Sequence, residues 1–358
     1  WTRSMNAVLI LSVGLGCALS PALVLRAAHW PQFRGPTGQG HSTEKRVPVA
    51  WSASSNVLWR ATIPGEGWSS PIVWGRHVFV TTATESGASC RVLALDAKNG
   101  TVRWEREVFR QATRKKETRN SYATPTPVTD GKRLYTCFGD GSFAALTFDG
   151  KVAWTNRSHP FYSQHGLGTS LVAHDGLVIM ARDGSSDGAD KLVGWQKPWD
   201  QSFLLALDAA TGRERWRTPR GLTRIAHGTP VMWKAGASTQ LVSETGDVVQ
   251  GFDPSSGRLL WTSRVAGEGK VPSPVLGDGM VFTSGGWGGK GTTKGMGRLG
   301  QASWARAARG SSSAASRLVL NFMVLSPVVG VGNEPGAALQ RASWEWICSA
   351  SRKRETML

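Results

Sequence analysis

The residues best suited to chemistry are three closely spaced carboxylates in the segment DGSSDGAD. Asp183, Asp187 and Asp190 could offer loop oxygens to calcium, which binds about six to eight oxygen ligands. Their spacing differs from that of an EF-hand loop, and no Glu follows to close such a loop. Turn capping by the same side chains is the simpler alternative. The sequence therefore offers one candidate metal site, with turn capping favoured over it.

Histidines and tryptophans supply two further candidate sites. Four histidines in the repeat region form no HxxxH or HExxH pattern: His159, His165, His174 and His227. His165 and His227 stand at the start of expected strands, near a rim or a central channel, and structural histidines are the commoner case. Trp195 and Trp199 could form an aromatic platform for a sugar or peptide. The alternative is that they pack their segment onto its own unit.

Recognisable catalytic signatures are missing from the sequence. It contains no serine elbow, no P-loop and no dinucleotide fingerprint, and GGWGGKGTTK has the glycines of a phosphate loop without its spacing. The cysteines show no CxxC pair and no metal-ligand spacing; they are Cys17, Cys90, Cys137 and Cys348. Cys90 and Cys137 are expected to be small buried side chains rather than a disulfide.

The formal net charge of +17 is unevenly distributed, since residues 290–358 are far more basic per residue than the rest. A basic run also occupies residues 103–119, where it could meet nucleic acid or acidic lipid. Three glutamates interrupt it, which favours a solvated loop between repeats. We therefore expect no nucleic-acid partner.

The N-terminal part of the sequence is apolar. Residues 7–25 are uncharged, as in a signal peptide or a short membrane anchor, and small residues follow that suit cleavage. The basic flank is weak because Arg3 precedes Met5. We assign residues 1–28 to a signal peptide or an anchor that would associate with the membrane, and we predict export to the periplasm or cell envelope.

A repeated motif, A-x-D-x-x-x-G-x-x-x-W, organises the rest of the chain. It appears as ALDAKNGTVRW at 94–104, ALDAATGRERW at 206–216 and GFDPSSGRLLW at 251–261, with the shorter ALTFDGKVAW at 145–154. Its key positions are Asp96, Gly100, Trp104, Gly150, Trp154, Asp208, Gly212, Trp216, Asp253, Gly257 and Trp261. Such internal periodicity is typical of repeat folds.

Each motif follows two short apolar strands and contributes two more. Four strands in about 45 residues predict a four-stranded antiparallel propeller blade. Continuous apolar runs such as VFVT and LVIMA fit sheets that are covered on both faces. The motif Gly allows a positive φ, the Asp can cap the turn, and the Trp offers a flat surface to the neighbouring blade. The fold class is therefore an all-β propeller over residues 29–289.

The first expected strand does not belong to any of these units. LWRATIPGEGWS at 58–69 resembles LWTSRVAGEGKV at 260–271, where a fourth strand leaves its blade. The N-terminal strand thus looks like the last strand of a blade without its other three. A ring closed by an N-terminal strand needs this arrangement.

The motifs resemble the tryptophan-docking repeats of pyrroloquinoline quinone (PQQ) propellers, the quinoprotein alcohol dehydrogenase-like superfamily. HWPQFRGPTGQGHS at 29–42 and the segment 183–208 are similar to exported bacterial PQQ-like propeller proteins. The resemblance implies that each motif Trp docks on the adjacent blade. In the dehydrogenases it implies PQQ, calcium and an adjacent Cys pair, which this sequence lacks. A more distant likeness is to BamB, a non-catalytic scaffold of the outer membrane.

The repeat pattern stops after a fifth unit begins at Pro272. Residues 290–358 form a non-repeat basic tail, which we interpret as out of frame or truncated, with a disordered tail as the alternative. About four blades and a fragment fall short of the six to eight that the resemblance implies. The propeller that this sequence predicts is therefore incomplete.

Two functions fit these observations. The first is a non-catalytic binding or scaffold protein of the bacterial envelope, with no cofactor, whose rim loops meet a protein or a glycan. The second is a quinoprotein oxidoreductase that uses PQQ and calcium, or a remnant of one. Fold analogy does not choose between them.

Overall fold

The structure is a computed structural model that describes residues 29–283, except 45–46, 53, 236–237, 266–268 and 278, and the backbone of Ser343–Cys348. The predictions for residues 1–28 and for most of 290–358 lie outside the described residues. The described part is almost entirely β, with one short 3-10 helix, η1 (Glu85–Gly87). No helix within it is long and apolar enough to cross a membrane.

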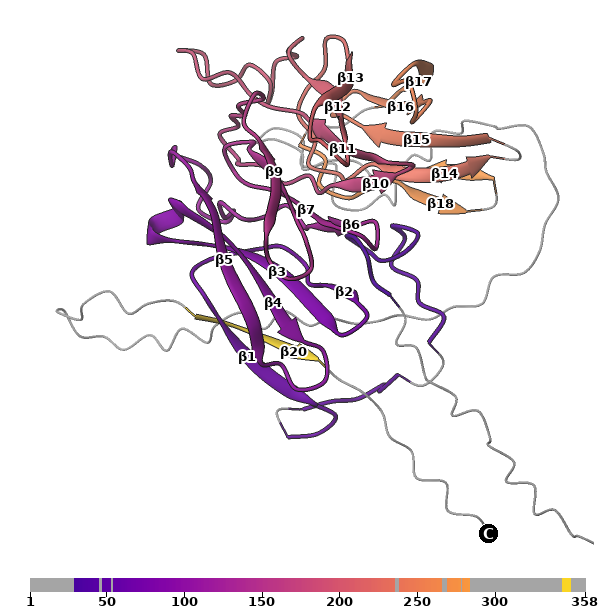
Figure 1. The fold of residues 1–358 in the computed structure, drawn as a ribbon. Coiled ribbons are helices and arrows are strands. Elements are labelled where there is room, and N and C mark those ends of the chain that lie inside the picture. The colour runs from indigo at the N-terminus through magenta and orange to yellow at the C-terminus, as the bar shows by residue number, and fades with distance from the viewer. Residues whose placement is uncertain are drawn as a thin grey trace, which may run out of the picture.

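Four antiparallel sheets of four strands follow one another along the chain (Figure 1). The first comprises β2 (Ile72–Trp74), β3 (His77–Thr84), β4 (Ser89–Asp96) and β5 (Val102–Arg110). The second comprises β6 (Val128–Thr129), β7 (Leu134–Cys137), β8 (Phe143–Leu146) and β9 (Val152–Asn156). The third comprises β10 (Val172–His174), β11 (Leu177–Arg182), β12 (Phe203–Asp208) and β13 (Glu214–Pro219). The fourth comprises β14 (Val231–Ala235), β15 (Ser238–Glu244), β16 (Val248–Phe252) and β17 (Leu259–Arg264). The predicted propeller fold is confirmed.

Two smaller pairings accompany these blades. β18 (Val275–Gly277) and β19 (Met280–Phe282) form a hairpin that begins a fifth unit. β1 (Trp59–Pro64) pairs antiparallel with β20 (Ser343–Cys348), from Trp59 opposite Cys348 to Pro64 opposite Ser343. The first strand therefore pairs with a strand from the far end of the chain, as a closing strand is expected to do.

The apolar core lies between the blades. The middle strands β3, β11 and β16 are buried along almost their whole length, because a neighbouring sheet covers each of their faces. One cluster joins Ile72 and Phe79 of the first blade to Leu134 and Leu146 of the second, and similar clusters occupy the next two interfaces. Stacked blades thus explain the continuous apolar runs.

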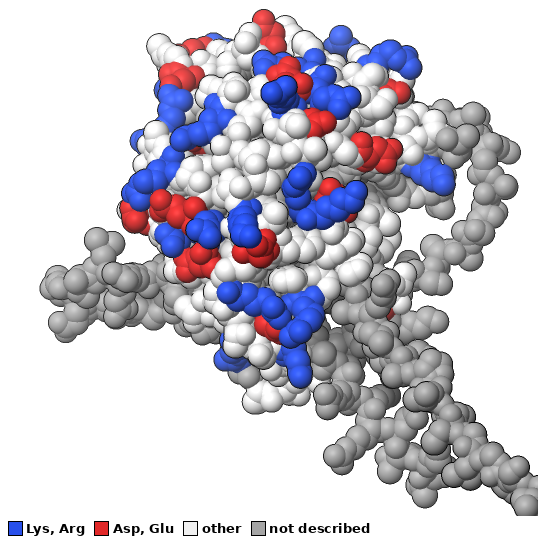
Figure 2. Space-filling model, viewed as in Figure 1, with Lys and Arg blue, Asp and Glu red and all other residues white. Residues whose placement is uncertain are grey.

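The outermost strands carry the charge. β5 is mostly exposed, and basic and acidic side chains are interspersed on the face that Figure 2 shows. Arg103 pairs with Asp96, and Arg110 pairs with Glu85. Our interpretation of residues 103–119 as a loop is wrong up to Arg110, because the solvent side of an outer strand accepts charges as readily as a loop does.

Each of three motif tryptophans contacts the turn of the next blade. The indole Nε1 of Trp104 donates to the carbonyl of Phe148 at 2.8 Å, and that of Trp154 donates to Ala209 at 3.0 Å. Trp216 donates to the Pro254 carbonyl at 3.2 Å. The ring of each indole covers the motif glycine of that turn. The same joint therefore recurs at three successive interfaces.

The motif turns are built for this close approach. Gly100, Gly150, Gly212 and Gly257 all have positive φ, between 72° and 85°. A Cβ on Gly212 would lie 2.4 Å from the Trp154 ring. In the three longer turns the Asp carboxylate accepts backbone N–H groups within its own turn. Hydrogen bonds from the Ser255 hydroxyl and from the backbone N–H of Ser256 lower the pKa of Asp253 to about 2. Glycine is thus required by both conformation and space.

Two tryptophans depart from the expected pattern. Trp59, on β1, lies on Gly100 and donates to the Ala97 carbonyl at 3.0 Å, so it is a docking residue that the motif search did not assign. Trp261 donates to Gln240 Oε1 of its own blade at 2.7 Å. It lies so close to Gly251 that a Cβ there would be 2.1 Å from its Nε1, which explains why this motif begins with Gly instead of Ala.

Two glycine substitutions separate the space requirement from the conformational one. Gly212→Ala should destabilise the fold by about 1–2 kcal/mol for its φ and by about 1–3 kcal/mol more for the clash with Trp154. Gly176→Ala has the same kind of φ, at 77°, but nothing within 4 Å of the new Cβ. Free energies of unfolding measured in urea should therefore differ between the two variants. Equal losses would show that the tryptophan contact is unimportant.

Candidate functional site

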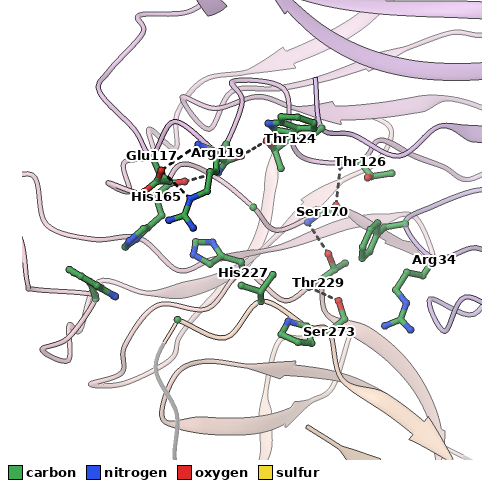
Figure 3. A pocket seen from close by; sticks show the side chains of 18 residues that line it. Arg34, Glu117, Arg119, Thr124, Thr126, His165, Ser170, His227, Thr229 and Ser273 are labelled. Carbon is green, nitrogen blue, oxygen red and sulfur yellow. Dashed lines mark hydrogen bonds and ion pairs between the residues drawn. The ribbon is translucent and has the colours of Figure 1, made fainter. Parts of the chain in front are cut away.

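A row of hydroxyl groups connects the inner edges of the blades. The N–H of Ser70 donates to Thr126 Oγ1 at 2.9 Å, and the N–H of Thr126 donates to Ser170 Oγ at 3.0 Å. The N–H of Ser170 donates to Thr229 Oγ1, and that of Thr229 to Ser273 Oγ, both at 3.0 Å. We call Thr126, Ser170, Thr229 and Ser273 the hydroxyl belt (Figure 3).

The belt was missed in the sequence although a signal was present. Its members stand at the same point of successive units, just before the innermost strand, and a proline follows Thr126, Thr229 and Ser273. Ser and Thr are too common to be singled out without the structure. Their function is to satisfy buried backbone donors where no strand of the next blade is in reach.

A cavity of about 930 Å³ lies along the belt, toward the axis of the blades. All four belt residues line it, together with Phe33 and Arg34 from the N-terminal segment and with residues of the loops that precede the inner strands. The volume is in the range of small-molecule pockets. This cavity is the candidate functional site.

One end of the cavity is crossed by residues 30–39, which we call the N-terminal segment. Trp30 exchanges backbone hydrogen bonds with Val73 of the first blade, and the N–H of Thr129 in the second donates to the Pro31 carbonyl. Gln39 Oε1 accepts from the N–H of Leu276 in the fifth unit at 2.8 Å. The segment therefore passes from the first blades to the last described one, and Phe33 and Arg34 lie between these contacts.

The other end of the cavity contains two histidines and a tryptophan. The rings of His165 and His227 are 5.9 Å apart at 78°, and those of His165 and Trp195 are 5.3 Å apart at 71°. Burial, with a smaller contribution from His165, lowers the pKa of His227 to about 4, and burial also lowers the pKa of His165. Both imidazoles are therefore neutral at pH 7. In Figure 3 they lie on the opposite side of the belt from Arg34.

The other aromatic and histidine candidates do not join this group. Trp199 forms a backbone bridge with Thr223 and packs near Gly184, so it shares no platform with Trp195. His159 lies against Arg217 at 2.9 Å, and His174 is on β10 beside Asp175. The structure therefore brings His165, His227 and Trp195 together and separates the rest.

The charges that line the cavity leave one cation without a partner. Glu117 pairs with Arg119 at 3.3 Å, and hydrogen bonds from Arg119 and Thr118 lower the Glu117 pKa to about 2. The guanidinium of Arg34 has no hydrogen bond or ion pair among the described residues. The cavity thus offers one uncompensated positive charge.

The three carboxylates proposed as calcium ligands are not brought together. Asp183 is buried and pairs with Arg220 at 3.0 Å. Asp187 pairs with Arg114 and Lys191, and Asp190 pairs with Lys197 at 2.6 Å. Within the described ranges no group of three or more His, Cys, Asp or Glu side chains is placed to hold a metal ion. The expected ligand set is therefore not assembled.

Asp183 has a structural role instead. Burial raises its pKa to about 6 against the opposing effect of Arg220, so the pair is ionised at neutral pH. Arg220 also donates to Ser243 Oγ of the fourth blade at 3.0 Å. A second buried pair, Glu244 with Lys270 at 3.7 Å, lies beyond it. These charges connect the third blade to the fourth and to the start of the fifth unit.

The described lining does not fit a PQQ cofactor held by calcium. Glu117 is the one carboxylate on the described cavity wall, and Arg119 engages it, whereas calcium needs about six to eight oxygen ligands. Cys90 and Cys137, the two cysteines whose side chains the structure describes, are free and buried. Burial raises the pKa of the Cys137 thiol to about 12.

Sequence comparison identifies the family. The profile described as "Outer membrane protein assembly factor BamB" matches residues 41–112, 91–197 and 200–337, which is well over half of the chain. The chain therefore belongs to this family of PQQ-like β-propellers, within the quinoprotein alcohol dehydrogenase-like superfamily.

Individual relatives are more distant. The chain is 25% identical over 223 residues to the polyvinylalcohol dehydrogenase of a Sphingopyxis species, a match of 61% of this chain and 32% of that protein. Quinohemoprotein alcohol dehydrogenase from Comamonas testosteroni superposes with a TM-score of 0.49 at 14% identity, over 74% of this chain and 48% of that one. BamB from Moraxella catarrhalis gives 0.39 at 20%, over 66% and 57%. The chain spans less than two thirds of each.

Paired aspartate variants distinguish the ion pair from a metal site. Asp183→Asn should destabilise the protein by about 3–5 kcal/mol because Arg220 is left buried without a counter-ion. Asp187→Asn, on a half-exposed pair, should cost about 0–1 kcal/mol. Both are measured by urea unfolding with and without calcium. A shared calcium site would instead give the parent chain a calcium-dependent gain in stability that both variants lose.

Two Thr→Val substitutions test the belt. Thr229→Val removes the acceptor of the Ser170 N–H and should cost about 1–3 kcal/mol, since a buried donor is left unpaired. Thr223 is the control: it is equally buried, and its hydroxyl has no partner among the described residues. Thr223→Val should therefore be neutral or slightly stabilising. The difference is read from thermal and urea unfolding. A Thr229→Val variant as stable as Thr223→Val would mean that the belt does not hold the blades together.

Proposed function

We propose that this chain is a non-catalytic binding or scaffold protein of the bacterial envelope, which works without a cofactor. The observation that carries the proposal is the cavity on the blade axis. It is large enough for a ligand, and on its described wall the one carboxylate, Glu117, is engaged by Arg119 and the belt oxygens accept backbone N–H groups. A protein or a glycan is the proposed partner, at the rim loops and the cavity mouth.

The family supports both the function and the location. Its description names an outer-membrane assembly factor, which is an envelope function and not a catalytic one. Export of this chain to the periplasm or cell envelope is part of the proposal, and the apolar N-terminal region supports it.

A second function is favoured by one specific observation. The matching relative from Sphingopyxis is named a polyvinylalcohol dehydrogenase. The alternative is therefore a quinoprotein oxidoreductase that uses PQQ and calcium. The engaged carboxylate and the dispersed aspartates make it the weaker proposal.

Reconstitution separates the two functions. The purified chain is incubated with PQQ and calcium, and reduction of a redox dye is followed with primary alcohols, polyvinyl alcohol and sugars. We expect no calcium-dependent turnover, because the described cavity wall does not supply the oxygen ligands that calcium needs. The Comamonas enzyme, treated in parallel, is the positive control. Turnover above the protein-free rate would overturn the scaffold proposal.

A further inference from the structure

The hydroxyl belt offers O–H donors to the cavity. Each of its oxygens accepts a backbone N–H from the preceding blade, at 2.9–3.0 Å. None of these hydroxyls has an acceptor for its own proton within the described part of the chain. A hydroxyl has one O–H and two lone pairs, so each belt hydroxyl that accepts one N–H keeps its O–H to donate and one lone pair to accept. The four belt hydroxyls can therefore donate hydrogen bonds to a ligand in the cavity.

Arg34 adds a charged donor at the same end of the cavity. Its backbone has φ of 59°, a left-handed conformation, and its carbonyl accepts the N–H of Gly40 at 2.7 Å. This tight turn directs the side chain into the cavity, on the side of Thr229 and Ser273 in Figure 3. Phe33, its neighbour, also lines a small hollow together with Thr229 and Ser273, which places the segment next to the belt.

The rest of the lining is neutral or apolar. His165 and His227 carry no charge at pH 7, and Glu117 and Arg119 cancel one another. Trp68 and Val271 line the opening and are 38% and 65% exposed. One uncompensated cation matches a monoanion better than a phosphate dianion, and the apolar opening suits an apolar stem.

We propose that the end of the cavity formed by Arg34 and the hydroxyl belt binds the carboxylate group of a ligand with an apolar body. The guanidinium fork matches a carboxylate in two hydrogen bonds, and belt hydroxyls donate to its remaining lone pairs. The carboxylate belongs to a free organic acid or to the C-terminus of a polypeptide. This inference rests on the proposed binding function and names the chemistry of its ligand.

The test is isothermal titration calorimetry of the full chain with two matched pairs of probes. One pair is phenylpropionate and its neutral amide. The other is the peptide acetyl-Gly-Gly-Phe with a free or an amidated C-terminus. Each acid should bind at least about tenfold more tightly than its amide, since a charge-assisted hydrogen bond is lost in the amide.

Variants assign the binding to Arg34. Arg34→Gln should weaken binding of the acids by at least about tenfold, and Arg34→Lys should retain part of the affinity because it keeps the charge but loses the planar fork. Arg213→Gln, the same change at an exposed arginine in a motif turn, is the control and should bind as the parent does. Unfolding curves verify that each variant is folded. The comparison of acids with amides on the unaltered chain tests the inference even if a variant fails to fold.

The outcomes are distinct. Binding of the peptide acid alone identifies a polypeptide C-terminus, and binding of phenylpropionate alone identifies a free organic acid. The inference is overturned if neither acid binds, if the amides bind as tightly, or if Arg34→Gln changes nothing. Dye reduction is measured separately from carboxylate binding. Turnover with PQQ would overturn the proposed function. If there is no turnover and no carboxylate binds, only this inference is overturned.

Discussion

An indole ring lying flat on a glycine of the next blade is the contact on which this architecture depends. A Trp buries a large apolar surface in one step, of about 150–250 Å², and its N–H fixes the register through one carbonyl, as Trp154 does with Ala209. The partner turn must therefore present bare backbone, which only glycine at positive φ supplies. In the first three blades, which carry both the indole and the glycine, the indole docks on one neighbour and the glycine receives the indole of the other.

The hydroxyl belt completes the same interfaces from the inside. Each of the three interfaces between the four complete blades has an indole toward the outer strand and a Ser or Thr hydroxyl at the inner one, with apolar side chains between them. The inner joint has a chemical consequence that the outer one lacks. It occupies one lone pair of each belt oxygen and leaves the O–H to donate, so the polarity of the cavity follows in part from how the blades are held together.

Much of the blade architecture could be predicted from the sequence, for physical reasons. Glycine and tryptophan at fixed spacing are rare enough to mark blades. The likeness of residues 58–69 to 260–271 indicated a closing strand but did not assign a docking role to Trp59. The belt was missed because Ser and Thr have many uses. The aspartates at 183–190 were considered together because they are close in sequence, yet the partner of Asp183 is Arg220 on the far side of a strand pair. Contacts between residues that are far apart in the sequence are invisible to local spacing.

The path of the N-terminal segment bears on the order in which the protein can fold. Residues 30–39 leave the ribosome before every blade, but Gln39 meets Leu276, more than two hundred residues later. The segment can reach the first two blades early and the fifth unit only late. Such widely separated contacts slow folding. The end of the cavity that this segment crosses can therefore be completed only after the fifth unit has been made.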